Sequence, residues 1–189
     1  LDSIIWMAEG RKYEEVVLMT ASLARLLRQS ISNEDEVVPL AREVEYAKGY
    51  LTIQKMRYKD KLEFEINVEP SILNIPLIKL VLQPIIENAI YHGLKYKESK
   101  GLLQVKGFMK DGNAVLQVID NGVGMDEETL AHIYDKHKVN YHSNGVGVYN
   151  VQKRLQLYYG ECYGITYESE KGVGTTATIT IPGMQEESI

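Results

Sequence analysis

The spacing of apolar residues changes near residue 60, and this change constrains the fold more than any other feature of the sequence. Before it, apolar residues recur every three or four positions in two segments, which is the period of an amphipathic helix. After it, Phe64, Ile66 and Val68 alternate with polar residues, as in a half-buried strand. We therefore expect a domain boundary near Asp60, with a helical region over residues 1–60 and a second unit over residues 61–189.

The helical region is predicted to be a hairpin of two helices. The apolar stripes are Val16, Met19, Leu23 and Leu26 in the first helix and Leu40, Val44, Ala47 and Leu51 in the second. The polar residues 32–36 separate the helices, and Pro39 suits the first turn of the second one. Because two helices of this size bury little surface alone, we expect the stripes to need a partner, and a second copy of the chain is the candidate.

The second region alternates between strand and helix patterns. Pro76 is predicted to open a helix through Ala89 that contains Pro84, whose missing N–H removes a helical hydrogen bond. The remaining predicted elements are strands at 102–109, 114–120, 164–168 and 176–181 and a helix from Val148 that Gly160 closes. Residues 126–144 lack periodicity and predict a long mobile loop. This order favours an α+β fold, a two-layer α/β sandwich with helices on one face of a mixed sheet.

Composition excludes several classes of protein. Lys and Arg number 21 against 26 for Asp and Glu, a net charge of −5, so nucleic acid is not an expected partner. The single cysteine, Cys162, rules out an internal disulfide and a cysteine zinc cluster. We find neither a membrane-spanning apolar run nor a signal peptide, which predicts a soluble piece. The first residue is Leu1, not Met, so we expect a fragment of a longer chain.

Three Gly-x-Gly pairs stand beside predicted helices and strands: Gly122/Gly124, Gly145/Gly147 and Gly172/Gly174. Glycine lets a ligand approach the backbone, and the N–H groups at a helix start suit a phosphate. The segment Gly145-Val146-Gly147, just before the predicted helix, is therefore the best phosphate cradle. Asn150 stands where a dinucleotide fingerprint needs a third glycine, and no Walker loop occurs, so the two commonest nucleotide folds are excluded.

Polar residues also interrupt an apolar helix and end an apolar strand. Asn88 and His92 are four residues apart and share a helix face, with Glu87 beside them. Asp120 ends a strand in front of flexible glycines, where a carboxylate can accept a hydrogen bond from the amino group of a base. The alternatives are a solvated helix edge for the first group and a turn-forming aspartate for the second.

Taken in order, these segments resemble the N box and the glycine boxes of the GHKL ATPases, the superfamily with the Bergerat fold shared by gyrase, Hsp90, histidine kinases and MutL. The residues that carry the resemblance are Glu87-Asn88-Ala89, Asp120-Asn121-Gly122-Val123-Gly124-Met125, Gly145-Val146-Gly147 and Gly172-Val173-Gly174-Thr175-Thr176. The N-terminal part narrows it to sensor histidine kinases of the LytS and YesM type. It does so through Leu1-Asp2-Ser3-Ile4-Ile5, Leu40-Ala41-Arg42-Glu43-Val44 and residues 50–58, joined by His92-Gly93 and residues 150–155.

The resemblance implies a role for each residue of the site. Asp120 would accept the adenine amino group with support from Thr175, Asn88 would coordinate Mg²⁺ on the phosphates, and Glu87 would be the base or orienter for an attacking imidazole. The ATP-binding set would also contain His92, Gly122, Gly124, Met125, Gly145, Val146 and Gly147. We further expect Tyr91 to line the pocket, and Lys136, Lys138 and Arg154 to be solvated more readily than bound to phosphate.

The function that the resemblance implies is the cytoplasmic kinase core of a bacterial two-component sensor histidine kinase. It would bind Mg²⁺ and ATP and pass the γ-phosphate to a histidine upstream of Leu1, then to an aspartate on a response regulator. The full protein would be a homodimer that reaches the membrane only through upstream segments. The family's His-Phe-x-x-Asn-x-Leu motif is represented here only by its final Leu, so the acceptor is absent from this sequence.

Several alternatives stay open. One is an ATP-driven conformational clamp, another is a serine kinase that sequesters a sigma factor, and a third is a degenerate nucleotide-binding module. We do not expect a zinc site at His132, His137 and His142, because a five-residue spacing does not place these side chains on one helical face.

Overall fold

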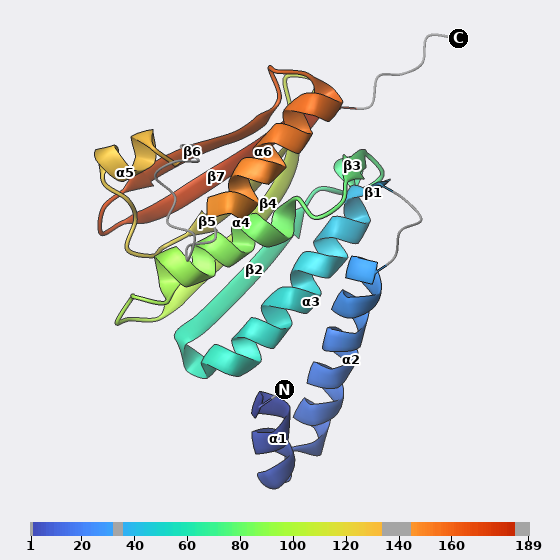
Figure 1. The fold of residues 1–189 in the computed structure, drawn as a ribbon, viewed down its shortest axis with the longest axis vertical. Coiled ribbons are helices and arrows are strands. Elements are labelled where there is room, and N and C mark those ends of the chain that lie inside the picture. The colour runs from blue at the N-terminus through green and yellow to red at the C-terminus, as the bar shows by residue number, and fades with distance from the viewer. Residues whose placement is uncertain (1, 32–35, 134–144, 184–189) are drawn as a thin grey trace.

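A mixed sheet of five strands packs against a layer of helices in the computed structural model, which describes residues 2–31, 36–133 and 145–183 (Figure 1). The strands, in spatial order, are β2 (Leu62–Val68), β4 (Gly101–Lys110), β5 (Asn113–Asp120), β7 (Gly174–Pro182) and β6 (Gly164–Glu170). The β2 and β4 strands pair in parallel, and the other neighbours are antiparallel. The predicted two-layer α/β sandwich is confirmed.

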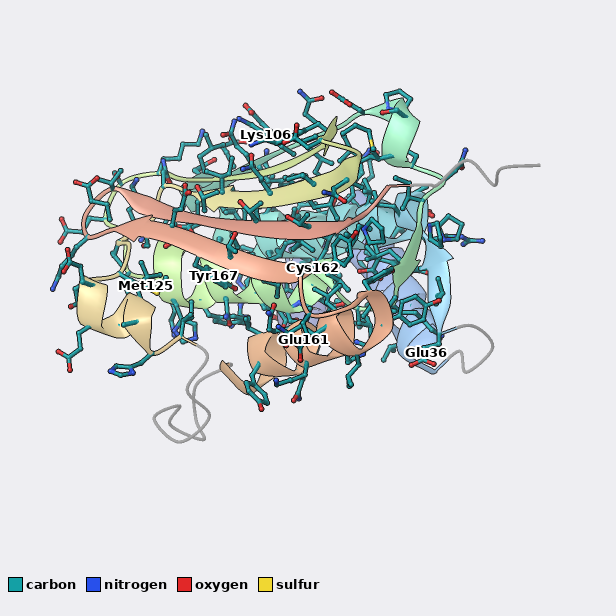
Figure 2. All side chains as sticks on the ribbon, turned by 90° about the horizontal axis from the view of Figure 1, so that it is seen from above. Glu36, Lys106, Met125, Glu161, Cys162 and Tyr167 are labelled. Carbon is teal, nitrogen blue, oxygen red and sulfur yellow. The ribbon has the colours of Figure 1, made fainter. Side chains whose placement is uncertain are left out.

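Alternation of apolar and polar residues decides which face of each strand is covered. Leu103, Val105, Leu116 and Val118 are buried, whereas Lys106 points away from the helices (Figure 2). Asp111 and Gly112 join β4 to β5 with φ angles of 50° and 77°, the conformation whose twist matches an antiparallel hairpin. The hairpin predicted from the turn at 111–113 is therefore confirmed.

Helices cover one face of the sheet (Figure 1). They are α3 (Leu40–Tyr58), α4 (Leu82–Asn88) and α6 (Gly145–Tyr159), with α2 (Tyr13–Ile31) packed along the outside of α3. The short α1 (Asp2–Glu9) folds back beside the first turns of α2, near the end of α3. The short elements are β1 (Val37–Pro39), η1 (Lys59–Lys61), η2 (Pro70–Ile72), β3 (Pro76–Ile78), the π-helical turn η3 (Ala89–Leu94) and α5 (Glu127–Ala131). The C-cap predicted at Gly160 is confirmed, since its φ is 106° and its N–H donates to Gln156 O at 2.9 Å. No helix in the described parts of the chain is both long and apolar enough to cross a bilayer.

The second helix of the hairpin shares a core with the sheet unit. Leu40, Ala47 and Leu51 of α3 belong to the same buried cluster as side chains of α4 and of the central strands. The stripe that we expected to need a second copy therefore has its partner within this chain, and Met19 of the other stripe is also buried. The boundary near Asp60 falls in η1 and stays a prediction.

The predicted start of the helix at Pro76 is wrong. Pro76 begins strand β3, which pairs with β1, and the helix begins only at Leu82. The cause is Glu43 of α3, whose carboxylate accepts the backbone N–H groups just before that start and so fixes where α4 begins. Pro84 lies in the first turn of α4, where N–H groups have no helical partner, so it removes no helical hydrogen bond.

The loop predicted over residues 126–144 is also partly wrong. It contains α5, whose first turn is capped by the Asp126 side chain accepting the Thr129 N–H at 3.0 Å. An aspartate followed by two glutamates is the sequence pattern of a helix start, which periodicity alone could not reveal in so short a helix. Residues 134–144 lie outside the described part of the chain.

Candidate functional site

A cavity of about 540 Å³ opens between the helical layer and one end of the central strands. Its walls are formed by α4 and η3, by the ends of β5 and β7, by β6, and by α5 with the residues just before and after it. The lining residues are Ile85, Asn88, Ala89, His92, Gly93, Val118, Asp120, Gly124, Met125, Glu128, Thr129, His132, Ile133, Tyr167, Thr175 and Ala177. Met125 and Tyr167 lie on the helix side of the sheet (Figure 2).

Asp120 is the buried carboxylate of this cavity, with 5% of its surface exposed. Its Oδ1 accepts the Gly122 N–H at 2.8 Å, and the Thr175 backbone N–H donates to the same carboxylate. Burial raises the pKa of Asp120 to about 6, although these two hydrogen bonds and the charge of Lys97 act in the opposite direction. The group is therefore mostly ionised at neutral pH and is a strong acceptor inside an apolar pocket.

Two glycines allow Asp120 to lie where it does. A Cβ at Gly93 would lie 2.6 Å from Asp120 Oδ1, and one at Gly122 would meet the same oxygen at 2.6 Å. The Val123 N–H donates to Gly93 O at 3.1 Å, which ties the π-helical turn η3 to the loop after β5. The glycine that follows His92 is thus required by the close contact of backbone and carboxylate.

Asn88 lies at the end of α4 and lines the cavity. Its Oδ1 is buried and has no hydrogen-bond partner within the described residues. A buried amide oxygen without a partner costs free energy unless a ligand satisfies it. Carboxamide oxygens are hard ligands that suit Mg²⁺, which keeps several waters and takes few protein groups, so this residue fits the metal.

Other predicted residues of the ATP-binding set occupy different positions around the cavity. His92, Gly124, Met125 and Thr175 line it. His92 is partly exposed, and partial burial together with the nearby Lys95 lowers the pKa of its imidazole, which favours the neutral form. Gly122 lies behind Asp120.

Glu87 is not among the residues that line the cavity. Its Oε1 accepts a hydrogen bond from Gln83 Nε2 at 2.9 Å, and its negative charge helps burial to raise the pKa of Tyr50 on α3. The prediction that Tyr91 lines the pocket is wrong, because its hydroxyl instead lies 3.5 Å from Arg57 on α3.

The second of the three Gly-x-Gly pairs, Gly145/Gly147, lies at the start of α6. Gly145 starts this helix, one turn earlier than predicted, and a Cβ at Gly147 would lie 3.5 Å from Pro84 of α4. The Val146 side chain, Lys136, Lys138, His137 and His142 lie outside what the structure describes. Burial raises the pKa of Glu43, and the charge of Arg154 on α6 is one of the influences that act in the opposite direction.

Two residues near the site were missed by the sequence reasoning. Lys97 donates a hydrogen bond to Asn121 O beside Asp120, and Ser169 contacts the loop on one side and Thr175 on the other. Neither lies in a motif. The one sequence signal for Ser169 is its place three residues before Gly172. Gly172 lies in the turn between β6 and β7, so Ser169 is near the end of the strand that precedes this turn.

Family models match both regions of the chain. The model described as histidine kinase-, DNA gyrase B-, and HSP90-like ATPase matches residues 74–185, more than half of the sequence. The chain belongs to this ATPase family. A second model, described as histidine kinase, matches residues 1–62. The resemblance to GHKL ATPases and to sensor histidine kinases is confirmed.

Curated relatives agree with this family. Sensor histidine kinase YesM of Bacillus subtilis is 32% identical over 98% of this chain and 31% of its own length. Sensor protein LytS of Oceanobacillus iheyensis is 34% identical over 74% of this chain and 24% of its own length. The chain therefore spans less than a third of the length of these relatives.

Solved structures share the fold. The histidine kinase domain of an Erythrobacter litoralis blue-light activated histidine kinase superposes with a TM-score of 0.57 at 15% identity, covering 89% of this chain and 74% of that one. The catalytic domain of histidine kinase ThkA gives a TM-score of 0.61 at 16% identity, covering 80% of this chain and all of that one. At these identities the likeness concerns the fold alone.

Proposed function

We propose that the chain is the kinase core of a sensor histidine kinase, which binds Mg²⁺ and ATP in the cavity and phosphorylates a histidine outside this sequence. The observation that carries the proposal is the buried Oδ1 of Asn88, which no described residue hydrogen-bonds, in the same cavity as the buried carboxylate of Asp120. One of these groups suits a metal ion on phosphates, and the other suits the amino group of a base.

In this proposal Asp120 and Thr175 accept hydrogen bonds from the amino group of adenine. The Gly122 N–H holds the Asp120 carboxylate in place by donating a hydrogen bond to it. Gly124 and Met125 border the base, and His92 at the rim contacts the ribose or phosphates. Gly145-Val146-Gly147, in the first turn of α6, offers N–H groups to the phosphates. Asn88 holds Mg²⁺, which neutralises phosphate charge when bound.

The proposed reaction is an in-line transfer of the γ-phosphoryl group. A ring nitrogen of the acceptor imidazole attacks the γ-phosphorus, the bond to the β-phosphate oxygen breaks, and ADP leaves. The ring proton passes to a base, the role we give to Glu87. Glu87 does not line the cavity and is close enough to Tyr50 of α3 to affect its pKa. In this proposal the acceptor imidazole therefore approaches the cavity from the side of α3. Positioning and charge neutralisation supply most of the rate in such transfers.

Partners follow from the same proposal. The phosphoryl group passes from the histidine to an aspartate of a response regulator. A homodimer is supported by large apolar side chains exposed on α1 and α2, including Trp6, Val17 and Leu18. The membrane location of the whole protein depends on segments that would precede this sequence.

The test uses a chain extended upstream by its native residues and incubated with Mg²⁺ and γ-labelled ATP. We expect a protein-bound label that is lost in acid and kept in base, as for phosphohistidine. Asn88→Ala should abolish it, whereas Asn67→Ala, at an exposed position of β2, should not. An acid-stable label would instead indicate a serine kinase, and ATP hydrolysis without a label would indicate a clamp.

A further inference from the structure

Three polar side chains stand in a row across neighbouring strands at the cavity end of the sheet. Asp120 of β5 is paired with Thr175 of β7, and Thr175 is paired with Ser169 of β6. Directly paired residues project to the same face, so all three side chains lie on the helix side. Asp120 and Thr175 line the cavity, whereas Ser169 is not among its lining residues and reaches Thr175 through its hydroxyl.

The Ser169 hydroxyl has more neighbours than one proton can serve. Its Oγ lies 2.8 Å from the Met125 backbone nitrogen, 3.0 Å from Gly174 O and 2.9 Å from Thr175 Oγ1. The Met125 N–H can only donate and the Gly174 carbonyl can only accept. Ser169 therefore accepts from Met125 and gives its single proton to Gly174.

This arrangement fixes the direction of the third hydrogen bond. With its own proton used, Ser169 can only accept from Thr175, so the Thr175 hydroxyl proton points back toward Ser169. The lone pairs of Thr175 Oγ1 are then left to face the cavity beside the Asp120 carboxylate. Two adjacent acceptors suit a group that donates two protons, such as an exocyclic amine, and disfavour a carbonyl.

We propose that Ser169 is a positioning residue for nucleotide specificity, which holds Thr175 as an acceptor toward the 6-amino group of adenine. The inference rests on the proposed function, since it needs ATP to occupy this cavity. Ser169 itself touches no part of the nucleotide and acts through the direction of one hydroxyl. It thereby favours a 6-aminopurine over a 6-oxopurine.

The test compares ATP with purine riboside triphosphate, which lacks the 6-amino group, in equilibrium binding titrations of this chain. Ser169→Ala should weaken ATP binding by roughly three- to tenfold, the range for one hydrogen bond, and leave binding of the analogue unchanged. Ser169→Thr, which keeps the hydroxyl, should restore ATP affinity. Thr166→Ala, at an exposed position on the same strand, is the matched control and should change neither affinity. In a Thr175→Val background, Ser169→Ala should have no further effect.

Each other outcome has a definite meaning. An equal loss for both nucleotides would show that Ser169 only supports the Met125 loop, and would overturn the inference while leaving the ATP site in place. No loss for either nucleotide would overturn it as well. If the unmodified chain bound neither nucleotide, or bound both equally well, the proposed adenine site itself would be wrong.

Discussion

The Glu43 carboxylate on α3 accepts the backbone N–H of Leu80 at 2.8 Å, a residue that begins the approach to α4 with a φ of 60°. The same carboxylate accepts the N–H groups of Val81 and Leu82 at 2.9 and 3.2 Å. Only 2% of Glu43 is exposed, and burial raises its pKa even though three donors oppose that shift. A side chain of the hairpin thus caps the helix that carries the N box.

We expect Glu43→Gln to lower the free energy of unfolding by about 1–3 kcal/mol, because an amide N–H₂ cannot accept and would face the N–H groups of α4. Urea denaturation followed by circular dichroism measures this change. Glu45→Gln on the same helix, where the side chain is exposed, should change stability by less than about 0.5 kcal/mol. Equal stability of the two variants would contradict the capping role.

Gly93→Ala should damage the site more than the fold. The new Cβ would lie 2.6 Å from Asp120 Oδ1, so the carboxylate or the π-helical turn must shift. A displaced acceptor should weaken ATP binding on the order of tenfold or more. Titration calorimetry gives the affinity. Gly49→Ala in α3, where a Cβ meets nothing within 4 Å, should leave binding unchanged and raise stability by about 0.5–1 kcal/mol.

Asp120→Asn should abolish ATP binding and make the protein more stable at neutral pH. The pKa of Asp120 is raised from 3.8 to about 6, so at pH 7 the folded chain holds a charge that burial disfavours. This cost disappears as the pH falls through 6 toward 4, because the folded state then takes up a proton before the unfolded state does. The stability advantage of the variant, about 1–3 kcal/mol at pH 7.5, should therefore shrink over that interval.

Denaturant titrations of both chains at pH 7.5, 6 and 5 measure the difference. A stability difference that stayed the same at all three pH values would mean that the pKa of Asp120 does not lie in this pH range. Undiminished ATP affinity in the folded variant would contradict the assignment of Asp120 to the adenine site.

The Tyr159 hydroxyl joins α6 to β3. It accepts the Ile78 N–H at 3.2 Å and donates to Pro76 O at 3.0 Å. Tyr159→Phe should leave the N–H of buried Ile78 without an acceptor and lower the free energy of unfolding by about 1–2 kcal/mol. Tyr158→Phe, at a neighbouring side chain that is 54% exposed, should have little effect. Thermal unfolding of the two variants distinguishes them, and equal melting temperatures would contradict this account.

The sequence predicted the elements whose pattern repeats over many residues. The alternation in β4 and β5 and the helical periods of α2, α3 and α6 depend on local spacing, so they could be predicted without tertiary information. The start of α4 could not, because Glu43, a residue distant in the sequence, decides it. The short α5 has too few turns for a period, and β1 and β3 too few residues for alternation.

The candidate site also contains residues that the sequence could predict and residues that it could not. Asp120, Asn88 and Thr175 belong to ordered motifs, and the structure brings all three to one cavity. Ser169 contributes only through its register opposite Thr175, which pairing of β6 with β7 establishes. The prediction for Tyr91 failed because neighbours in sequence point to different sides of a helix, and its hydroxyl lies toward Arg57 of α3.

The burial of α3 against α4 and the sheet determines where this ATPase-family unit can be joined to another protein. A chimera whose junction follows Tyr58 would replace Leu40, Ala47 and Leu51, and would remove the acceptor for three N–H groups at the start of α4. A chimera whose junction precedes Val37 retains β1, α3 and the Glu43 cap of this chain. The transplantable unit is thus longer than the nucleotide-binding motifs alone, and α3 travels with it.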